Sequence, residues 1–144
     1  MSQGFLIDTN VLSELMRKVP APAVLNWFAA RPGAWMHVCS ISQAEIWTGI
    51  ALLPVGKRRD ALTAAAESLF NQDLIGRCLD FDALAAKHYA IIHAKRRQVG
   101  QPISTEDGQI AAIALAHNMD LVTRNTTDFR SIEGLNLHNP WQFQ

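Results

Sequence analysis

Four acidic side chains stand near the starts of expected helices, three of them after an expected strand: Asp8, Glu45, Asp107 and Asp128. Carboxylates gathered in one cleft repel one another, and burial raises their pKa values. A divalent cation relieves that repulsion, and oxygen donors without His or Cys suit Mg²⁺ or Mn²⁺. An ion held in this way activates water and binds phosphate oxygens, so the pattern indicates metal-dependent phosphoester chemistry.

The same acids also fit purely structural roles. The segments 42–45 and 104–107 both resemble a capping box, with a hydroxyl at the first position and an acid three residues later. Asp8 fits the cap of the helix that follows it, and Asp128 fits a turn. Acids near a helix N-terminus are favoured by the helix dipole as well. Only their convergence in space separates the two interpretations.

Short apolar runs alternate with helical patterns along the chain, and these elements must position the acids. The expected strands are 5–7, 35–39, 77–81, 121–123 and 135–137. The expected helices are 11–16, a segment from Val24, 46–53, 58–74, 83–99 and 104–118. This alternation predicts an α/β fold, with helices on both faces of a mostly parallel sheet of four to five strands. Ligands of such sheets bind outside the carboxyl ends of the strands.

Length and composition limit the class of protein. The 144 residues fit one domain, 1–144, and 13 basic residues balance 13 acidic ones. Without a basic surplus, a nucleic acid must be held by a local patch. The longest apolar stretch, 110–116, is too short for a membrane span, and residues 1–4 show no signal peptide. We expect a cytoplasmic protein in which Cys39 and Cys78 are buried, reduced thiols.

Several apolar side chains are expected inside the protein. The helical spacing of 83–99 places Ala86, Ala90 and Ile91 on the inner face, and Trp35 is expected in the core. The apolar stripe 62–70 has helical spacing too. It fits either the core of this chain or a surface that binds a partner.

Four ordered motifs resemble those of the PIN domain, and a short C-terminal sequence resembles the end of PIN toxins of the VapC or FitB type. The first motif is Phe5–Leu12, with the sequence DTN in it. The second, third and fourth are Ser42–Gly49, Asp107–Ala112 and Leu121–Phe129, and the ending is Asn139-Pro140-Trp141. The motifs occur in family order and cover nearly the whole chain.

This resemblance implies a three-layer α/β/α fold and an endoribonuclease that depends on Mg²⁺ or Mn²⁺. It implies the toxin of a type II toxin–antitoxin pair, a cognate VapB- or FitA-like antitoxin encoded beside it, and a homodimer. Transfer RNA is a possible target. Asp8, Glu45 and Asp107 correspond to metal-binding acids, with Asp8 and Asp107 on the main ion. The fourth position is Asn125 or Asp128, and we expect Asp128.

Neighbouring polar residues are expected to support these acids. Thr9 and Thr123 resemble the hydroxyl positions of the family, and Asn125 can bind a ligand water. A hydroxyl beside a carboxylate orients that carboxylate or a metal-bound water. Ordinary capping is the alternative role for both threonines.

Basic residues are candidates for contact with RNA. Arg124, inside the fourth motif, is the best-placed cation for a phosphate contact. The clusters 57–59 and 95–97 either flank the acidic cleft or form solvated faces. The five histidines show no metal-ligand spacing.

Two other functions fit the same residues. One is a metal-dependent DNA nuclease or phosphatase that uses the same acids. The other is a non-catalytic binding domain in which the acids only cap helices. The latter predicts no binding of Mg²⁺ and little electrostatic coupling among the four acids.

Overall fold

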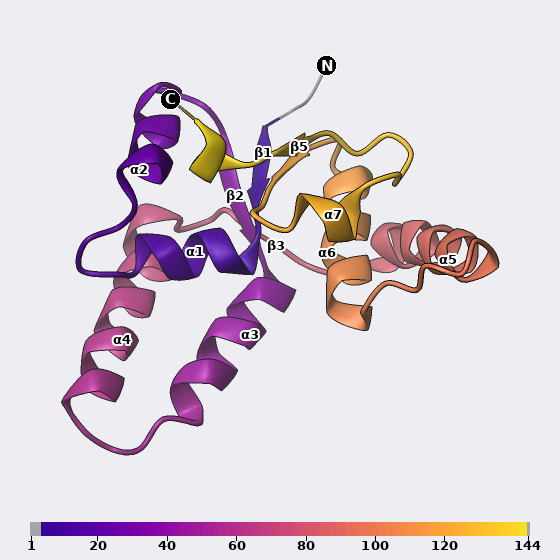
Figure 1. Ribbon diagram of the computed structural model, residues 1–144. Helices are drawn as coiled ribbons and strands as arrows, with labels where there is room; N and C mark the ends of the chain where they lie inside the picture. Colours follow the sequence, from indigo (N-terminus) through magenta and orange to yellow (C-terminus); the bar gives the residue numbers. More distant parts are fainter. Residues whose placement is uncertain (1–3, 144) are drawn as a thin grey trace.

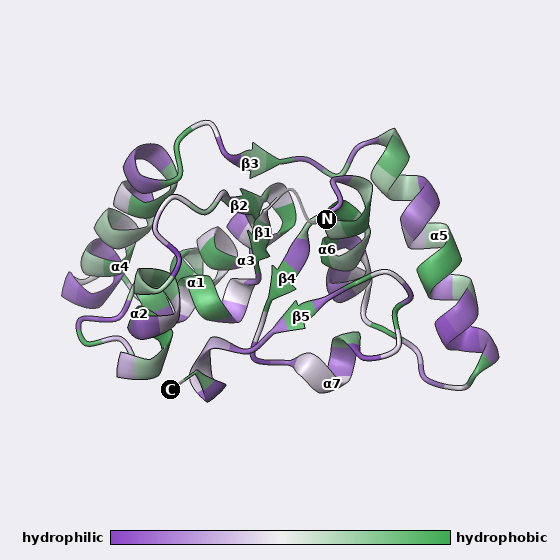
Figure 2. Ribbon diagram, turned by 90° about the horizontal axis from the view of Figure 1, so that it is seen from above, coloured by the Kyte–Doolittle hydropathy of each residue, from purple (hydrophilic) through white to green (hydrophobic). Residues whose placement is uncertain are grey.

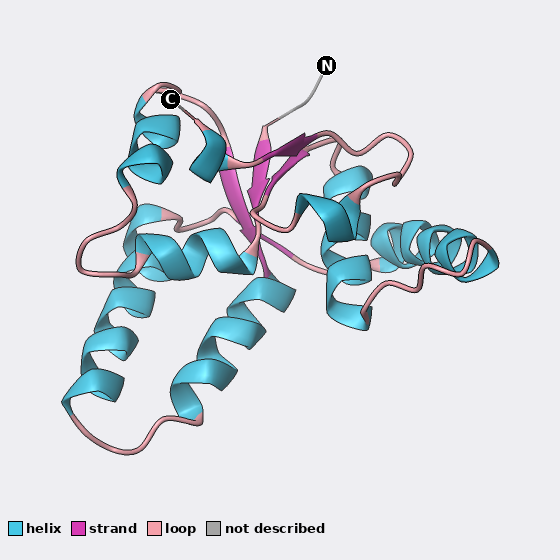
Figure 3. Ribbon diagram, in the orientation of Figure 1, coloured by secondary structure: helices cyan, strands magenta, loops and turns pink. Residues whose placement is uncertain are grey.

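A single sheet of five parallel strands forms the centre of the protein. The computed structural model describes residues 4–143. The strands are β1 (Phe5–Ile7), β2 (Met36–Cys39), β3 (Cys78–Leu79), β4 (Asp120–Val122) and β5 (Leu137–His138). They lie in the order β3-β2-β1-β4-β5, so β1 is central. Figure 3 shows the strands together in the middle of the molecule, with helices around them. Because all strands are parallel, their carboxyl ends share one edge of the sheet.

Helices cover both faces of this sheet. They are α1 (Thr9–Leu15), α2 (Pro22–Ala29), α3 (Ser40–Ala51), α4 (Lys57–Ser68), α5 (Ala83–Gln98), α6 (Thr105–Ala116) and α7 (Thr126–Phe129). A π-helical turn, η1 (Leu69–Asp73), continues α4, and a 3₁₀ turn, η2 (Pro140–Gln142), follows β5. Figure 1 and Figure 2 show α1, α2 and α4 on one side of the strands, and α5, α6 and α7 on the other. The predicted three-layer α/β/α fold is confirmed.

Successive side chains of a strand point to opposite faces of the sheet, and this divides the core into two clusters. In β1, Leu6 packs with residues of α5 and α6, whereas the next residue, Ile7, packs with residues of α1 to α4. Both side chains are buried because successive residues of a strand point to opposite faces, and both faces are covered. The stripe 62–70 belongs to the second cluster, with Ala66 and Phe70 buried, so its role as core is confirmed.

Several elements differ from the sequence-based expectation in their limits. The expected strand 77–81 pairs only over Cys78–Leu79, because it borders just β2 at the edge of the sheet. The expected helix 58–74 ends as α4 at Ser68 and widens into the π-helical turn. The helix expected at 46–53 begins earlier, at Ser40, directly after β2.

Three expectations about burial are wrong. Ala85 and Ile92, not Ala86, Ala90 and Ile91, are the buried residues of α5, because this helix lies at the outside of the fold and packs mainly on α6. Trp35 is 61% exposed in the loop before β2. The Cys78 thiol is exposed on the edge strand, whereas the Cys39 thiol is buried as expected.

Within residues 4–143, no helix is long and apolar enough to cross a bilayer. The segment 1–3, to which the expectation about a signal peptide mainly applies, lies outside the described residues.

Candidate active site

Asp8 lies at the carboxyl end of the central strand and begins α1. Its Oδ1 accepts a hydrogen bond from the Thr9 backbone N–H at 2.8 Å, which makes it the expected N-cap. Its Oδ2 accepts hydrogen bonds from Thr123 Oγ1 at 2.7 Å and Asn10 Nδ2 at 3.2 Å. The side chain is only 3% exposed, so these three donors replace most of its water.

The environment of Asp8 raises its pKa to about 6. Burial is the largest cause, since it penalises the charged form, and the charges of Asp107 and Glu45 act in the same direction. The hydrogen bond from Thr123 opposes the shift, because it stabilises the carboxylate. Three acids from distant parts of the sequence therefore share one electrostatic environment.

Glu45 is brought to this edge by α3. Thr9 Oγ1 lies 2.8 Å from Glu45 Oε1 and 2.9 Å from Ser42 Oγ, and its single proton serves one of these acceptors at a time. The expectation of a capping box at 42–45 is wrong, because α3 begins at Ser40 and Ser42 lies inside the helix. Thr9 thus links the end of β1 to the acid of α3, instead of capping a helix.

Asp107 lies in the first turn of α6. Its backbone N–H donates to Ser104 Oγ at 3.1 Å, which confirms the expected cap at Ser104. Burial raises the pKa of its half-buried carboxyl group, and the charges of Asp128, Glu45 and Glu106 raise it further. Asp107 therefore belongs both to the capped first turn of α6 and to the acidic rim, by which we mean the group Asp8, Glu45, Asp107 and Asp128.

Of the two residues expected at the fourth position, Asp128 is the one whose charge acts on Asp107. Its side chain is exposed in α7 and lines a small hollow together with Asp107 and Ser104. Asn125 precedes α7, and its backbone N–H donates to Thr123 Oγ1 at 3.0 Å. This contact uses the backbone of Asn125, whereas a role of its side chain stays a prediction.

Arg96 joins the segments that carry two of these acids. Its Nε donates to the carbonyl oxygen of Gln101 at 2.7 Å, and its Nη1 donates to the carbonyl oxygen of Asp128 at 3.0 Å. The same side chain lines the hollow that contains Asp107. Sequence reasoning grouped Arg96 with its basic neighbours 95–97 and missed this bridging role, since nothing in the local sequence marks these carbonyl partners.

The four acids of the rim do not form a closed ligand cage. Within residues 4–143, no three His, Cys, Asp or Glu side chains lie close enough to hold one ion among them. Mg²⁺ commonly keeps several waters and uses only one or two protein carboxylates. The donor set fits such an ion, because it consists of oxygens, and because burial together with the negative charges of the set raises the pKa values of Asp8 and Asp107.

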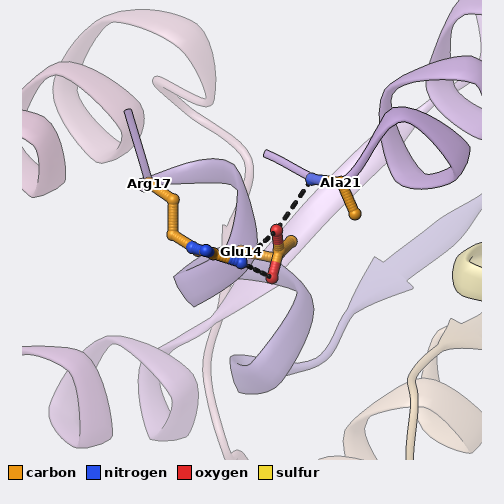
Figure 4. Close-up of polar contacts among 3 residues, drawn as sticks. All are labelled: Glu14, Arg17 and Ala21. Atoms are coloured by element: carbon orange, nitrogen blue, oxygen red, sulfur yellow. Dashed lines mark hydrogen bonds and ion pairs between the residues drawn. The ribbon is translucent and has the colours of Figure 1, made fainter. Parts of the chain in front are cut away.

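Glu14 is a buried acid with a different role. It lies in α1, six residues after Asp8. Its carboxylate accepts the Ala21 backbone N–H at 2.8 Å and pairs with Arg17 at 3.1 Å (Figure 4). Both partners lie in the connection between α1 and α2, Arg17 shortly after the end of α1 and Ala21 at the N-cap of α2. The structure thus separates an acid that ties two helices together from the acids at the edge of the sheet.

A comparison with known families matches residues 5–135 to the PIN domain. The "VapC ribonuclease Y4jK" of Sinorhizobium fredii is 39% identical over 95% of this chain and 97% of its own length. The "Toxin FitB" of Neisseria gonorrhoeae is 35% identical over 94% and 97%. The crystal structure of FitAcB from Neisseria gonorrhoeae superposes with a TM-score of 0.83 at 34% identity, covering 96% of this chain and 99% of that chain. The chain belongs to the PIN domain family.

Proposed function

We propose that the protein is an endoribonuclease that hydrolyses RNA phosphodiesters with the help of Mg²⁺ or Mn²⁺, and that it acts as the toxin of a type II toxin–antitoxin pair. The observation that carries this proposal is the carboxyl group of Asp8 at the carboxyl edge of the sheet, whose pKa is raised by its burial and, to a smaller extent, by the charges of Asp107 and Glu45. The family membership and the printed names of the ribonuclease and toxin relatives support the same function.

The metal would be held by Asp8 and Asp107, with Glu45 and Asp128 completing its surroundings directly or through water. Such an ion activates water and offsets negative charge on the phosphate in the transition state. Electrostatic coupling among the acids favours this role over simple helix capping, because the capping alternative requires no shared environment.

The side chains around the acids perform the positioning. Thr123 and Asn10 hold Asp8 Oδ2 in a fixed direction and favour the ionised form that a cation needs. Thr9 holds Glu45 in the same way. Arg124 is placed to contact a phosphate of the RNA backbone, which the balanced net charge of the chain would not attract by itself.

A matched set of variants tests this function. The wild-type protein is incubated with total RNA in Mg²⁺, in Mn²⁺ and in EDTA, beside Asp8→Asn and the control Glu67→Gln, an exposed acid of α4. We expect cleavage in either metal, none in EDTA, and a loss of at least about 100-fold in Asp8→Asn, whereas the control cleaves normally. Undiminished cleavage in EDTA or by Asp8→Asn excludes the mechanism.

The substrate class is a separate question. A DNA nuclease or a phosphatase would use the same acids, so RNA, single-stranded DNA and a small phosphoester are compared at equal protein concentration. We expect RNA to be cleaved fastest. Mapping of new 5′ ends in cellular RNA after induction, with Asp8→Ala as the control, identifies the target and tests the proposal of transfer RNA.

The partners follow from the same proposal. We propose a cytoplasmic protein that forms a homodimer and binds a cognate VapB- or FitA-like antitoxin encoded beside it. Co-expression with that neighbouring protein is expected to abolish growth arrest and to yield a complex in gel filtration. Sedimentation of the free protein measures the expected dimer, and a monomer would contradict it.

A further inference from the structure

The C-terminal segment holds a tryptophan at the same edge of the sheet as the acids. Trp141 lies in η2, shortly after the end of β5, and η2 packs against α2 (Figure 1). Asn139 Oδ1 accepts the Trp141 backbone N–H at 3.0 Å, and Pro140 is buried. Phe143 further along lies beside the Arg31 guanidinium, with 5.5 Å to its ring centroid. Trp141 is therefore fixed by contacts that do not involve the acidic rim.

Arg124 is held between this tryptophan and the acidic rim. Its guanidinium carbon lies 4.7 Å from the centroid of the Trp141 ring, within range of a cation–π interaction. Its backbone N–H donates to Asn10 Oδ1 at 3.2 Å, and Asn10 Nδ2 in turn donates to Asp8 Oδ2. The residue is thus tethered beside Asp8 through its backbone and on Trp141 through its side chain.

The contact with Trp141 matters because the Arg124 backbone is held close to one carboxylate, that of Asp8, with only Asn10 between them. The ion pairs formed among residues 4–143 do not include Arg124, and the charges that shift the Asp8 pKa are those of Asp107 and Glu45. A long, exposed arginine without a support samples many rotamers, including those directed at nearby acids. A guanidinium resting on an aromatic ring keeps its N–H groups available for a phosphate.

We propose that Trp141 is a positioning residue that holds the Arg124 guanidinium ready to bind a backbone phosphate of the RNA. This inference rests on the proposed function and adds the residue that orients its phosphate contact. Trp141 acts through Arg124 and takes no part in the hydrolysis itself. Removal of the ring therefore weakens RNA binding and leaves the rate of the bound complex nearly unchanged.

The experiment is a double-mutant cycle with Arg124→Gln, Trp141→Leu and the double variant. Trp141→Phe is the conservative rescue. Trp35→Leu is the matched control, because Trp35 also lies under an arginine, with Arg77 5.4 Å from its ring centroid, but precedes β2 at the opposite edge of the sheet. Cleavage of a labelled single-stranded 20-mer RNA of mixed sequence gives kcat and KM in Mg²⁺. Fluorescence anisotropy of the same RNA gives Kd in EDTA over a range of salt.

The expected results separate positioning from folding. Arg124→Gln raises KM and Kd about tenfold and lowers the slope of log Kd against log salt by about 0.7, the value for one phosphate contact on a single strand. Trp141→Leu raises both constants about three- to tenfold with kcat within about twofold, and Trp141→Phe recovers most of the loss. The double variant binds no worse than Arg124→Gln alone. The control is unchanged.

Other outcomes overturn the inference. Additive losses in the double variant assign Trp141 a structural role alone. The same holds if Trp141→Leu lowers both kcat and the melting temperature while the salt slope stays unchanged. If Trp141→Leu does not fold, Trp141→Met replaces it in the cycle. If the wild-type protein neither binds nor cleaves RNA, both the proposed function and this inference are wrong. If it binds RNA but the losses in the double-mutant cycle are additive, only this inference is wrong.

Discussion

At the scale of single residues, the ionised form of Asp8 costs stability. Its carboxyl pKa rises from 3.8 to about 6 on folding, so the folded state binds a proton more tightly than the unfolded state does between these values. Stability therefore falls as pH rises through that range, and the loss is complete above about pH 7. The cost is consistent with a group kept for chemistry, since a cap alone works equally well with Asn.

We expect Asp8→Asn to stabilise the metal-free protein by about 1–2 kcal/mol at neutral pH. The full shift corresponds to roughly 3 kcal/mol. Part of that gain is lost because the amide has one acceptor oxygen instead of two, so it cannot serve both Thr9 N–H on one side and Thr123 with Asn10 on the other. Urea unfolding in EDTA measures the difference, with Glu67→Gln as the exposed control. A less stable Asp8→Asn protein would show that the carboxylate is retained for folding.

We expect metal binding to depend on whether the Asp8 carboxyl group is protonated. We expect Mg²⁺ to raise the melting temperature at about pH 7.5 and to have little effect at about pH 5, because Asp8 is then mostly protonated. Thermal unfolding with Mg²⁺ or EDTA at both pH values measures this, and Asp8→Asn should show no shift at either. An equal Mg²⁺ shift at both pH values would place the ion elsewhere.

At the scale of elements, α1 is fixed to α2 by one buried acid. Glu14 binds the Ala21 N–H and Arg17, so its removal leaves a partly buried donor without an acceptor. We expect Glu14→Ala to lower the free energy of unfolding by about 1–3 kcal/mol, with Glu14→Gln losing less. Cleavage at a temperature where both variants are folded should match the wild type. A loss of kcat in folded Glu14→Gln would contradict this purely structural role.

Arg96 connects α5 with the loop before α6 and with α7. Without its two hydrogen bonds, the segments that carry Asp107 and Asp128 lose a common anchor. We expect Arg96→Gln to lower kcat about tenfold, since small displacements of catalytic groups are costly. Steady-state kinetics beside Arg97→Gln, its exposed neighbour, measures the effect. Equal losses in both variants would point to general positive charge instead of positioning.

The elements also show which local patterns were misleading. The prediction of the buried face of α5 was wrong because apolar residues occur on all sides of this helix, and only its contact with α6 selects the buried side. The π-helical turn after α4 has no counterpart in the sequence pattern, since the apolar spacing of 62–70 suits a continuous helix. The parallel direction of the strands, by contrast, was predicted correctly from the alternation of strands and helices.

At the scale of the whole molecule, balanced charge limits attraction to RNA. The net charge is zero, and Arg96 and Arg124 are the basic residues that hydrogen bonds tie to the segments of the acidic rim within residues 4–143. We therefore expect log Kd for single-stranded RNA to change with log salt with a slope of only about 1–2. Anisotropy titrations in EDTA measure the slope. A slope above about 4 would reveal a wider basic surface than these two residues.

The sequence by itself determined the chemistry: acids after strands and at helix starts, threonines beside them, and the order of alternating elements that predicts a parallel sheet. These properties are local, because side-chain type and hydrophobic period depend only on residues that are close together in the sequence. Tertiary structure alone decided that Thr123 binds Asp8 across 115 positions, that Arg96 joins two loops, and that Trp141 supports Arg124. Such contacts depend on the path of the whole chain, which no local spacing encodes.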